Sequence, residues 1–296
     1  MAVFTLPAEM IGFYKYYLEY ITEHAVDPDK RRYAVEKEAE KHYIDIDNFA
    51  SDSLSAFEEV PQRWSEAVEK FSEDTLRAYG IVPWQIQWDV MNLTKAFEER
   101  DVERILYLSA NLGHYVADAH VPLHTTVNYN GQLTGQKGIH GLWESRIPEL
   151  KAEEYDYLIG KAEYVKNPMK FTWEIVKESH SLVDSVLGIE KTLSLDFPSD
   201  QKYVFESRGQ STVKQYSREY AMEYHLLMNG MVESQMRKAI SALGSLWYTA
   251  WVNAGQPQLD KLLNNSGLDK LEKKGAVLDK EYSTGKEKGR IHDESD

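Results

Sequence analysis

The stretch GHYVADAHVPLHTTVNYNGQLTGQKGIHGLWESR, residues 113–146, gathers most of the chain's metal-binding residue types in a short space. Two of its pairs are spaced four residues apart: His114 with Asp118, and His140 with Glu144. Residues i and i+4 lie on one face of an α-helix, so each pair can hold one cation from two sides. Because the chain has no cysteine, imidazole and carboxylate are the ligands it can offer, and zinc accepts both.

His124 follows Asp118 by six residues and comes just after Pro122. Proline disfavours helix in the residue before it, so the helix that carries Asp118 is expected to end there, and His124 can turn back toward the same pocket. His120 falls on another helix face than His114 and is expected to line the pocket without binding metal. The pair of His114 and Asp118 alone could be a surface contact, and the other residues in register favour metal binding.

Composition limits the classes of protein that this chain can be. Its 296 residues allow one large domain or two small ones, and a hydrophobic fraction of 42% can supply a core. It has no run of about 18 apolar residues, so no transmembrane segment is expected. The start, MAVFTLPAEMIGF, lacks the basic and apolar regions of a signal peptide. A net charge of −14 argues against a protein that holds duplex nucleic acid on a broad basic surface.

Apolar residues recur at helical spacing along nearly the whole chain, whereas strand signals are thin. Helices are expected over residues 7–24, 31–41, 61–79, 86–100, 102–120, 141–150, 168–187 and 211–253, and loops over 128–138 and 194–209. Residues 256–296 become rich in Lys, Asp, Glu, Gly and Asn. The pattern therefore predicts an all-α fold: a single multi-helix domain over residues 1–255, followed by a polar, disordered tail over 256–296.

A second group of metal-type residues lies upstream, in HAVDPDKRRYAVEKEAEKHYIDID, residues 24–47. Its candidates are His24, Asp27, Asp29, His42, Asp45 and Asp47. Asp is a poor helix former, and residues 43–47 alternate between polar and apolar types. An irregular segment that presents its side chains to a cleft is therefore expected here.

Taken together, these residues resemble the zinc-dependent phospholipase C and single-strand-specific nuclease superfamily. The resemblance covers residues 1–255 and rests on the strings HYID (42–45), LGHYVAD (112–118), PLH (122–124) and IHGLWE (139–144). It also rests on the order and spacing of seven residues, which are Asp27, His42, His114, Asp118, His124, His140 and Glu144. In that family an all-α domain carries a cluster of three zinc ions that cleaves phosphodiesters. The resemblance therefore implies a domain built around a multinuclear zinc cluster.

By position, the resemblance assigns a ligand set to each zinc ion. The first ion would take Asp27, His42, His114 and Asp118, and the second would take His124, His140 and Glu144. Asp118 would also reach the third ion. Asp27 is preferred to Asp29 because its separation from His42 fits the family better, while Asp29 could cap a helix. Asp27 is also the candidate catalytic residue, a carboxylate that ligates zinc and accepts the proton of the attacking water.

The family's third zinc is completed by an N-terminal Trp and by a His a few residues later. Residue 1 of this chain is Met and the first histidine is His24, so the chain is expected to lack the family's first dozen or so residues. Two zinc ions are accordingly expected. Members of the family are typically secreted or periplasmic, whereas the sequence itself indicates no location.

Zinc lowers the pKa of bound water and neutralises phosphate oxygens, and phosphodiester hydrolysis needs both effects. The resemblance therefore implies a phosphodiester hydrolase, with a phospholipid head group or a single-stranded nucleic acid as substrate and no stable protein partner. Glu144 as the last ligand and the short segment before His140 favour a phospholipase C-like enzyme.

Two alternatives remain open at this point. The HYID string favours the nuclease branch, in which Tyr43 and Asp45 would hold a base by stacking and hydrogen bonding, although Tyr43 could equally be a core residue. The chain could also be a non-catalytic relative in which zinc only holds the helices together. The missing N-terminal ligands favour this last alternative.

Overall fold

The structure, a computed structural model, describes residues 1–50, 53–208, 211–263, 268–285 and 288. Most of these residues are helical, which confirms the predicted all-α class. The helices are α1 (Ala8–Tyr16), α2 (Leu18–Glu23), α3 (Asp27–Ala34), α4 (Ser53–Glu59), α5 (Trp64–Phe71), α6 (Glu73–Tyr79), α7 (Val82–Glu99), α8 (Val102–Ala119), α9 (Ile139–Gly141), α10 (Ile147–Lys151), α11 (Pro168–His180), α12 (Val183–Asp196), α13 (Arg218–Leu227), α14 (Met231–Asn253) and α15 (Leu268–Thr284). Three short turns also matter for the site: the 3₁₀ turns η3 (Ala39–Lys41) and η5 (Pro122–Thr125), and the π-helical turn η6 (Leu142–Arg146).

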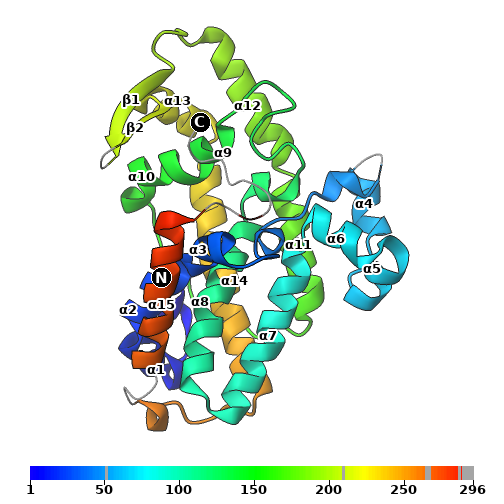
Figure 1. The fold of residues 1–296 in the computed structure, drawn as a ribbon, viewed down its shortest axis with the longest axis vertical. Helices are drawn as coiled ribbons and strands as arrows, with labels where there is room; N and C mark the ends of the chain where they lie inside the picture. The colour runs from blue at the N-terminus through cyan, green and yellow to red at the C-terminus, as the bar shows by residue number, and fades with distance from the viewer. Residues whose placement is uncertain (51–52, 209–210, 264–267, 286–287, 289–296) are drawn as a thin grey trace.

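Three long helices, α7, α8 and α14, form the centre of the fold, where they contact one another side by side (Figure 1). Their largest fully buried side chains include Trp84, Phe97, Tyr115 and Trp247, all in the main hydrophobic cluster. Between α7 and α8 the chain turns at Arg100, which is left-handed, and the Asp101 side chain accepts the backbone N–H of Arg104 to cap α8. None of the helices in the described residues is both long and apolar enough to cross a membrane.

A second hydrophobic cluster joins α10, α12, α13 and a β-hairpin at one end of the molecule (Figure 1). The hairpin pairs β1 (Tyr203–Arg208) with β2 (Ser211–Tyr216), antiparallel, with Tyr203 opposite Tyr216. The sequence predicted a loop up to residue 209 and a helix from 211, so this hairpin differs from the expectation. Its strands are rich in β-branched and aromatic residues, and the two opposing tyrosine rings lie 4.9 Å apart.

The segment expected to be a disordered tail contains the helix α15, which packs against α3 and α8. Lys30 of α3 forms an ion pair with Asp279 at 2.7 Å, and the ring of Tyr33 meets that of Tyr282 edge to face. The backbone N–H of Lys288 donates to the carbonyl of Arg32. Residues 268–285 therefore have packing partners in the structure that the composition of the segment did not indicate. The remaining parts of that expectation, 264–267, 286–287 and 289–296, lie outside the described residues.

Candidate metal centre

The fold brings six of the seven ligands assigned from the sequence together with Asp29, from five stretches of chain. Asp29 lies on α3, His42 directly follows η3, and His114 and Asp118 lie on α8. The remaining three are His124 in η5, His140 in α9 and Glu144 in η6. Within the described residues, two sets of side chains could each hold a metal ion. We call Asp29, His42 and His114 the first group, and His124, His140 and Glu144 the second group.

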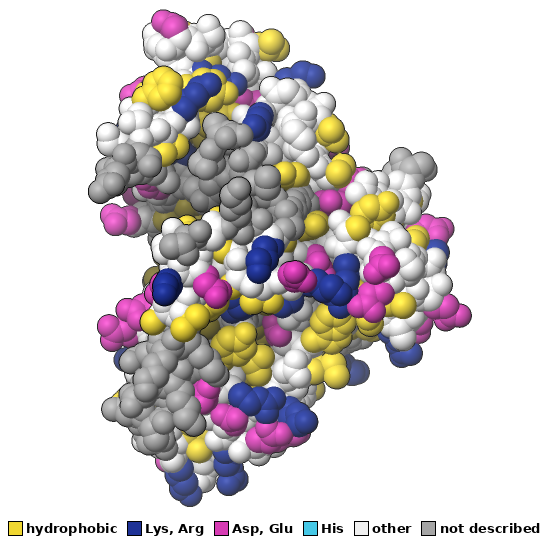
Figure 2. All heavy atoms as spheres, viewed as in Figure 1, with side chains coloured by type: hydrophobic (Ala, Val, Ile, Leu, Met, Phe, Trp, Pro, Cys, Tyr) yellow, Lys and Arg dark blue, Asp and Glu magenta, His cyan; other side chains and the backbone are white. Residues whose placement is uncertain are grey.

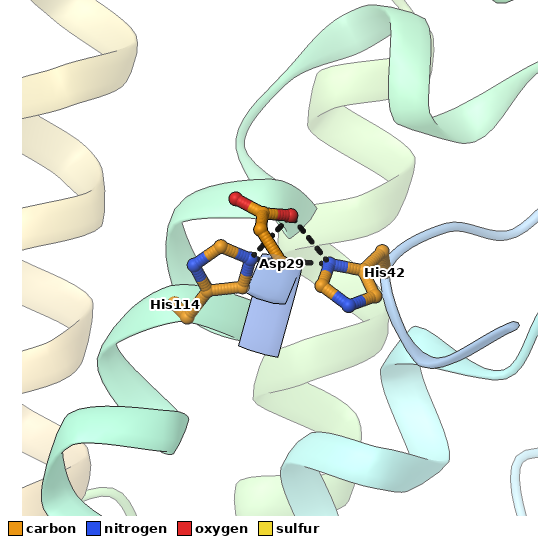
Figure 3. A group of neighbouring side chains, drawn as sticks. All are labelled: Asp29, His42 and His114. Carbon is orange, nitrogen blue, oxygen red and sulfur yellow. Dashed lines mark hydrogen bonds and ion pairs between the residues drawn. The ribbon is translucent and has the colours of Figure 1, made fainter. Parts of the chain in front are cut away.

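In the first group, three side chains from separate elements point toward one another (Figure 3). Nε2 of His114 lies 3.1 Å from Nδ1 of His42. Oδ1 of Asp29 lies 3.4 Å from Nε2 of His114 and 3.6 Å from Nδ1 of His42. Three donor atoms that converge at such distances suit a single small cation.

Asp118 brings a further donor atom, a second carboxylate oxygen, close to the two imidazoles of the first group. Its Oδ2 lies 3.0 Å from Nδ1 of His42 and 3.4 Å from Nε2 of His114. Ligand atoms about 2.0–2.1 Å from one zinc ion lie roughly 3.3 Å from one another, close to the distances from this oxygen to the two nitrogens, although the set whose donor atoms are all mutually close is Asp29, His42 and His114. Although this oxygen is buried, it has no hydrogen bond of good geometry to any described residue. A bound cation would give Oδ2 of Asp118 the partner that the neighbouring ring nitrogens do not.

Three of the histidines are held by backbone carbonyls in the orientation that a metal ligand needs. Nδ1 of His114 donates to the carbonyl of Ala25 at 2.9 Å, and Nδ1 of His124 donates to that of His42 at 2.6 Å. Nδ1 of His140 lies 3.2 Å from the carbonyl of Tyr129. With the proton on Nδ1, the lone pair of each neutral ring is on Nε2, which points into its group.

In the second group the carboxylate oxygen lies closer to the two imidazole nitrogens than in the first group, and Glu144 lies in the π-helical turn η6. Oε2 of Glu144 lies 2.8 Å from Nε2 of His140 and 3.2 Å from Nε2 of His124. The expected single helix from residue 141 is in fact π-helical over Leu142–Arg146 and α-helical again from Ile147. π-Helical turns are rare and occur frequently at functional sites.

The two groups share a structural connection through His42. Its side chain belongs to the first group, whereas its carbonyl holds the ring of His124 in the second. The backbone N–H of Ile44 in turn donates to the carbonyl of His124 at 2.9 Å. Asp118 lies between the groups, because its Oδ1 is 3.9 Å from Nδ1 of His124. The two groups are therefore neighbours that His42 and Asp118 connect.

The charges within the centre stabilise one another. Burial raises the pKa of Glu144, but His124 and His140 lower it more, so that it lies well below its ordinary value. Burial also raises the pKa of Asp118, but His114 and His124 lower it by more, so that it lies below its ordinary value. Burial lowers the pKa of His124, but Glu144 and Asp118 raise it to about 9. The two carboxylates thus favour positive charge on the histidines beside them. A bound cation would supply this charge in place of the protons on the histidine rings.

Asp29, and not the preferred Asp27, faces the two imidazoles of the first group. Oδ2 of Asp27 instead accepts a hydrogen bond from His24 at 2.6 Å, and Nζ of Lys30 lies 3.2 Å from its other oxygen. Successive side chains on an α-helix are about 100° apart, so residues two positions apart point in nearly opposite directions. The expected cap by Asp29 is also not seen, because α3 has no side-chain cap in the described residues. The spacing of three between His24 and Asp27 was the sequence signal that Asp27 had another partner.

The expected base-binding residues Tyr43 and Asp45 are both buried and belong to neither of the two groups. Tyr43 packs against Gly80, whose backbone comes so close that a Cβ there would lie 2.2 Å from the tyrosine carbonyl. The backbone N–H of Asp45 donates to the carbonyl of Tyr79. His120 is also buried, with Nδ1 bonded to the carbonyl of Val116, and it lies outside both groups.

No protein-family model, curated protein or solved structure matches this chain.

Proposed function

We propose that this protein is a zinc-dependent hydrolase of phosphodiester bonds, similar to phospholipase C. The observation that carries the proposal is the convergence of two groups of metal-ligand type, with three imidazoles already oriented by backbone carbonyls. The resemblance found in the sequence supports the same activity.

The donor set fits zinc better than the harder cations. Imidazole nitrogens dominate both groups, and Mg²⁺ and Ca²⁺ prefer sites made of oxygen alone. The second group offers three protein ligands, the number found in catalytic zinc sites, in which the fourth position is open to water or substrate. Zinc bound in these groups would activate water at neutral pH and offset the negative charge of a phosphodiester.

Asp29 takes over the role first expected of Asp27. It lies beside His42 and His114, and its side chain is 44% exposed, whereas those imidazoles are largely buried. A carboxylate that reaches both the metal groups and solvent can accept a proton from water in the site. Asp118 is buried between the groups. Its role is instead to orient the neighbouring imidazole rings and to neutralise positive charge beside them.

Two observations favour a phospholipid head group over a single-stranded nucleic acid. Tyr43, which would stack on a base in the nuclease branch, is buried against Gly80 and is only 8% exposed. The net charge is −14, and acidic and basic side chains are interspersed on the face drawn in Figure 2, which does not favour a long polyanion. The phospholipase C-like activity is therefore the one proposed.

The test compares metal content and hydrolysis on one preparation. After dialysis against trace zinc, metal analysis should give at least two zinc ions per chain. The protein should then hydrolyse bis(p-nitrophenyl) phosphate and release phosphocholine from phosphatidylcholine, and a chelator should abolish both activities. Single-stranded DNA serves as the competing substrate, and faster cleavage of it would favour the nuclease alternative.

Two results would contradict the proposal in different ways. One zinc ion or none would remove the proposed centre. Two zinc ions without hydrolysis of any of the three substrates would identify a non-catalytic protein with structural zinc.

A further inference from the structure

A buried cluster of charged and polar side chains lies beside the first group and is not part of it. Its centre is Arg31, on α3, and its other members are Glu38, Lys41, Asn111 and Tyr115. We call these five residues the Arg31 cluster. All except Lys41 are buried to the level of the hydrophobic core, with Arg31 only 7% exposed.

The contacts within the cluster join three segments of chain. Nε and Nη2 of Arg31 both lie 3.1 Å from Oε1 of Glu38, and the same oxygen accepts the hydroxyl of Tyr115 at 2.5 Å. Oε2 of Glu38 accepts Nζ of Lys41 at 2.6 Å. Arg31 also donates to Oδ1 of Asn111 and to the Tyr115 hydroxyl, each at 3.2 Å.

Arg31 follows a single stripe along α8. Its guanidinium lies 5.6 Å from the ring centre of Tyr107 and bonds to Asn111 and Tyr115, which are spaced four residues apart on one helix face. This stripe borders the one that carries His114 and Asp118. The position of α3 against α8 is therefore fixed at the level of the metal ligands.

Each ligand of the first group has a neighbour in the chain that belongs to the Arg31 cluster. Asp29 precedes Arg31 by two residues on α3, His42 directly follows Lys41, and His114 directly precedes Tyr115. The Tyr115 ring also meets that of His42 edge to face at 5.4 Å. One buried cluster thus contacts all three ligand-bearing segments, whereas the second group is carried by η5, α9 and η6.

We propose that Arg31 is a positioning residue for the first metal group, because it holds α3, the segment before His42 and α8 at the spacing that a single ion requires. This inference rests on the proposed zinc centre. Buried ion clusters contribute little net stability compared with apolar packing of the same volume, so stability alone does not account for this one. Side chains that orient metal ligands typically change metal affinity by about 10–100-fold when they are removed.

The test measures the zinc dissociation constant of each group separately. His140→Ala removes the second group and leaves the first as the site that is titrated, and His114→Ala does the reverse. Arg31→Met is then added to each background. It should weaken zinc binding about 10–100-fold in the His140→Ala background and by a much smaller factor in the His114→Ala background, where Arg31 reaches the second group only through the His42 carbonyl. A purely structural role for Arg31 would weaken both sites equally.

Two further variants complete the design. Tyr115→Phe removes one hydroxyl and keeps the ring, so it should fold even if Arg31→Met does not, and it should weaken chiefly the first group, by a smaller factor. Lys202→Met is the matched control, because it also takes a cation from a buried carboxylate, that of Glu190, at the hairpin end of the fold. It should change neither dissociation constant.

The outcomes separate this inference from the proposed function. Unchanged binding by the first group in both Arg31→Met and Tyr115→Phe, or equal weakening of the two groups, would overturn the role of Arg31 alone. An unmutated protein that binds no zinc would overturn the proposed centre, and the role of Arg31 with it.

Discussion

Replacing Asp89 with Asn should stabilise the protein above pH 7 and leave its stability nearly unchanged near pH 4. Asp89 lies on α7 and is only 4% exposed. Its Oδ1 accepts a hydrogen bond from Gln85 at 3.0 Å, whereas its Oδ2 has no hydrogen-bond partner among the described residues. Burial raises its pKa from an ordinary 3.8 to about 7, although the nearby cations Lys41 and Arg31 oppose this. The carboxyl group is therefore costly to ionise in the folded state.

The sign and size of the effect follow from the two pKa values. Because the folded pKa lies above the unfolded one, the folded state holds its proton longer, and stability falls as pH rises from about 4 to about 7. A difference of 1 between the folded and unfolded pKa values corresponds to about 1.36 kcal/mol. The difference here is about 3, so the loss in the free energy of unfolding has an upper limit of about 4 kcal/mol. Asn cannot ionise, so the variant escapes the loss.

Guanidinium chloride unfolding of the two proteins at pH 4.5, 6 and 8, with chelator present, measures the difference in the free energy of unfolding. The advantage of Asp89→Asn should increase with pH and level off near pH 8, at about 2–4 kcal/mol. Asp196→Asn, at an exposed carboxylate, is the control and should show no such trend. A difference that does not vary with pH would refute the reasoning, as would a variant less stable than the parent at pH 8.

Three further predictions concern the centre and the segment beside it. His124→Ala should reduce hydrolysis of bis(p-nitrophenyl) phosphate at least 100-fold with little change in the far-UV circular dichroism, whereas His225→Ala should stay active; an active His124→Ala protein would show that the second group is misassigned. Asp29→Ala should lower the zinc content measured after dialysis. Asp27→Ala should retain zinc and lower the melting temperature, because Asp27 pairs with His24 and Lys30. The reverse result would identify Asp27, and not Asp29, as the metal ligand. Gly80→Ala should lower the free energy of unfolding by at least about 2 kcal/mol, because φ is +89° and the new Cβ would meet the Tyr43 carbonyl; denaturant unfolding that shows no loss would contradict this contact.

The elements that sequence predicted well are those with a strong local signal. The i,i+4 pairs of residues 114/118 and 140/144 do converge, at 3.4 Å and 2.8 Å respectively. Pro122 does follow the end of α8, and His124 does turn back toward Asp118. Helix periodicity and proline are properties of a few neighbouring residues, so sequence alone can identify them.

Other features depend on contacts between distant parts of the chain. Whether Asp27 or Asp29 faces the centre depends on the rotation of α3, which Arg31 fixes through residues some 80 positions away. The β-hairpin and α15 pack against partners elsewhere in the chain, which the local composition of either segment does not reveal. The π-helical turn at Leu142–Arg146 likewise leaves no mark in the order of apolar and polar residues.

His42 should couple metal binding by the two groups. An ion held by its ring would restrain the same residue whose carbonyl fixes His124. A chain loaded at one group has thus already lost part of the conformational freedom that loading the other requires, and linkage makes this effect reciprocal. Titration of the unmutated protein should accordingly be steeper than two independent binding steps, and half-loaded chains should be scarce.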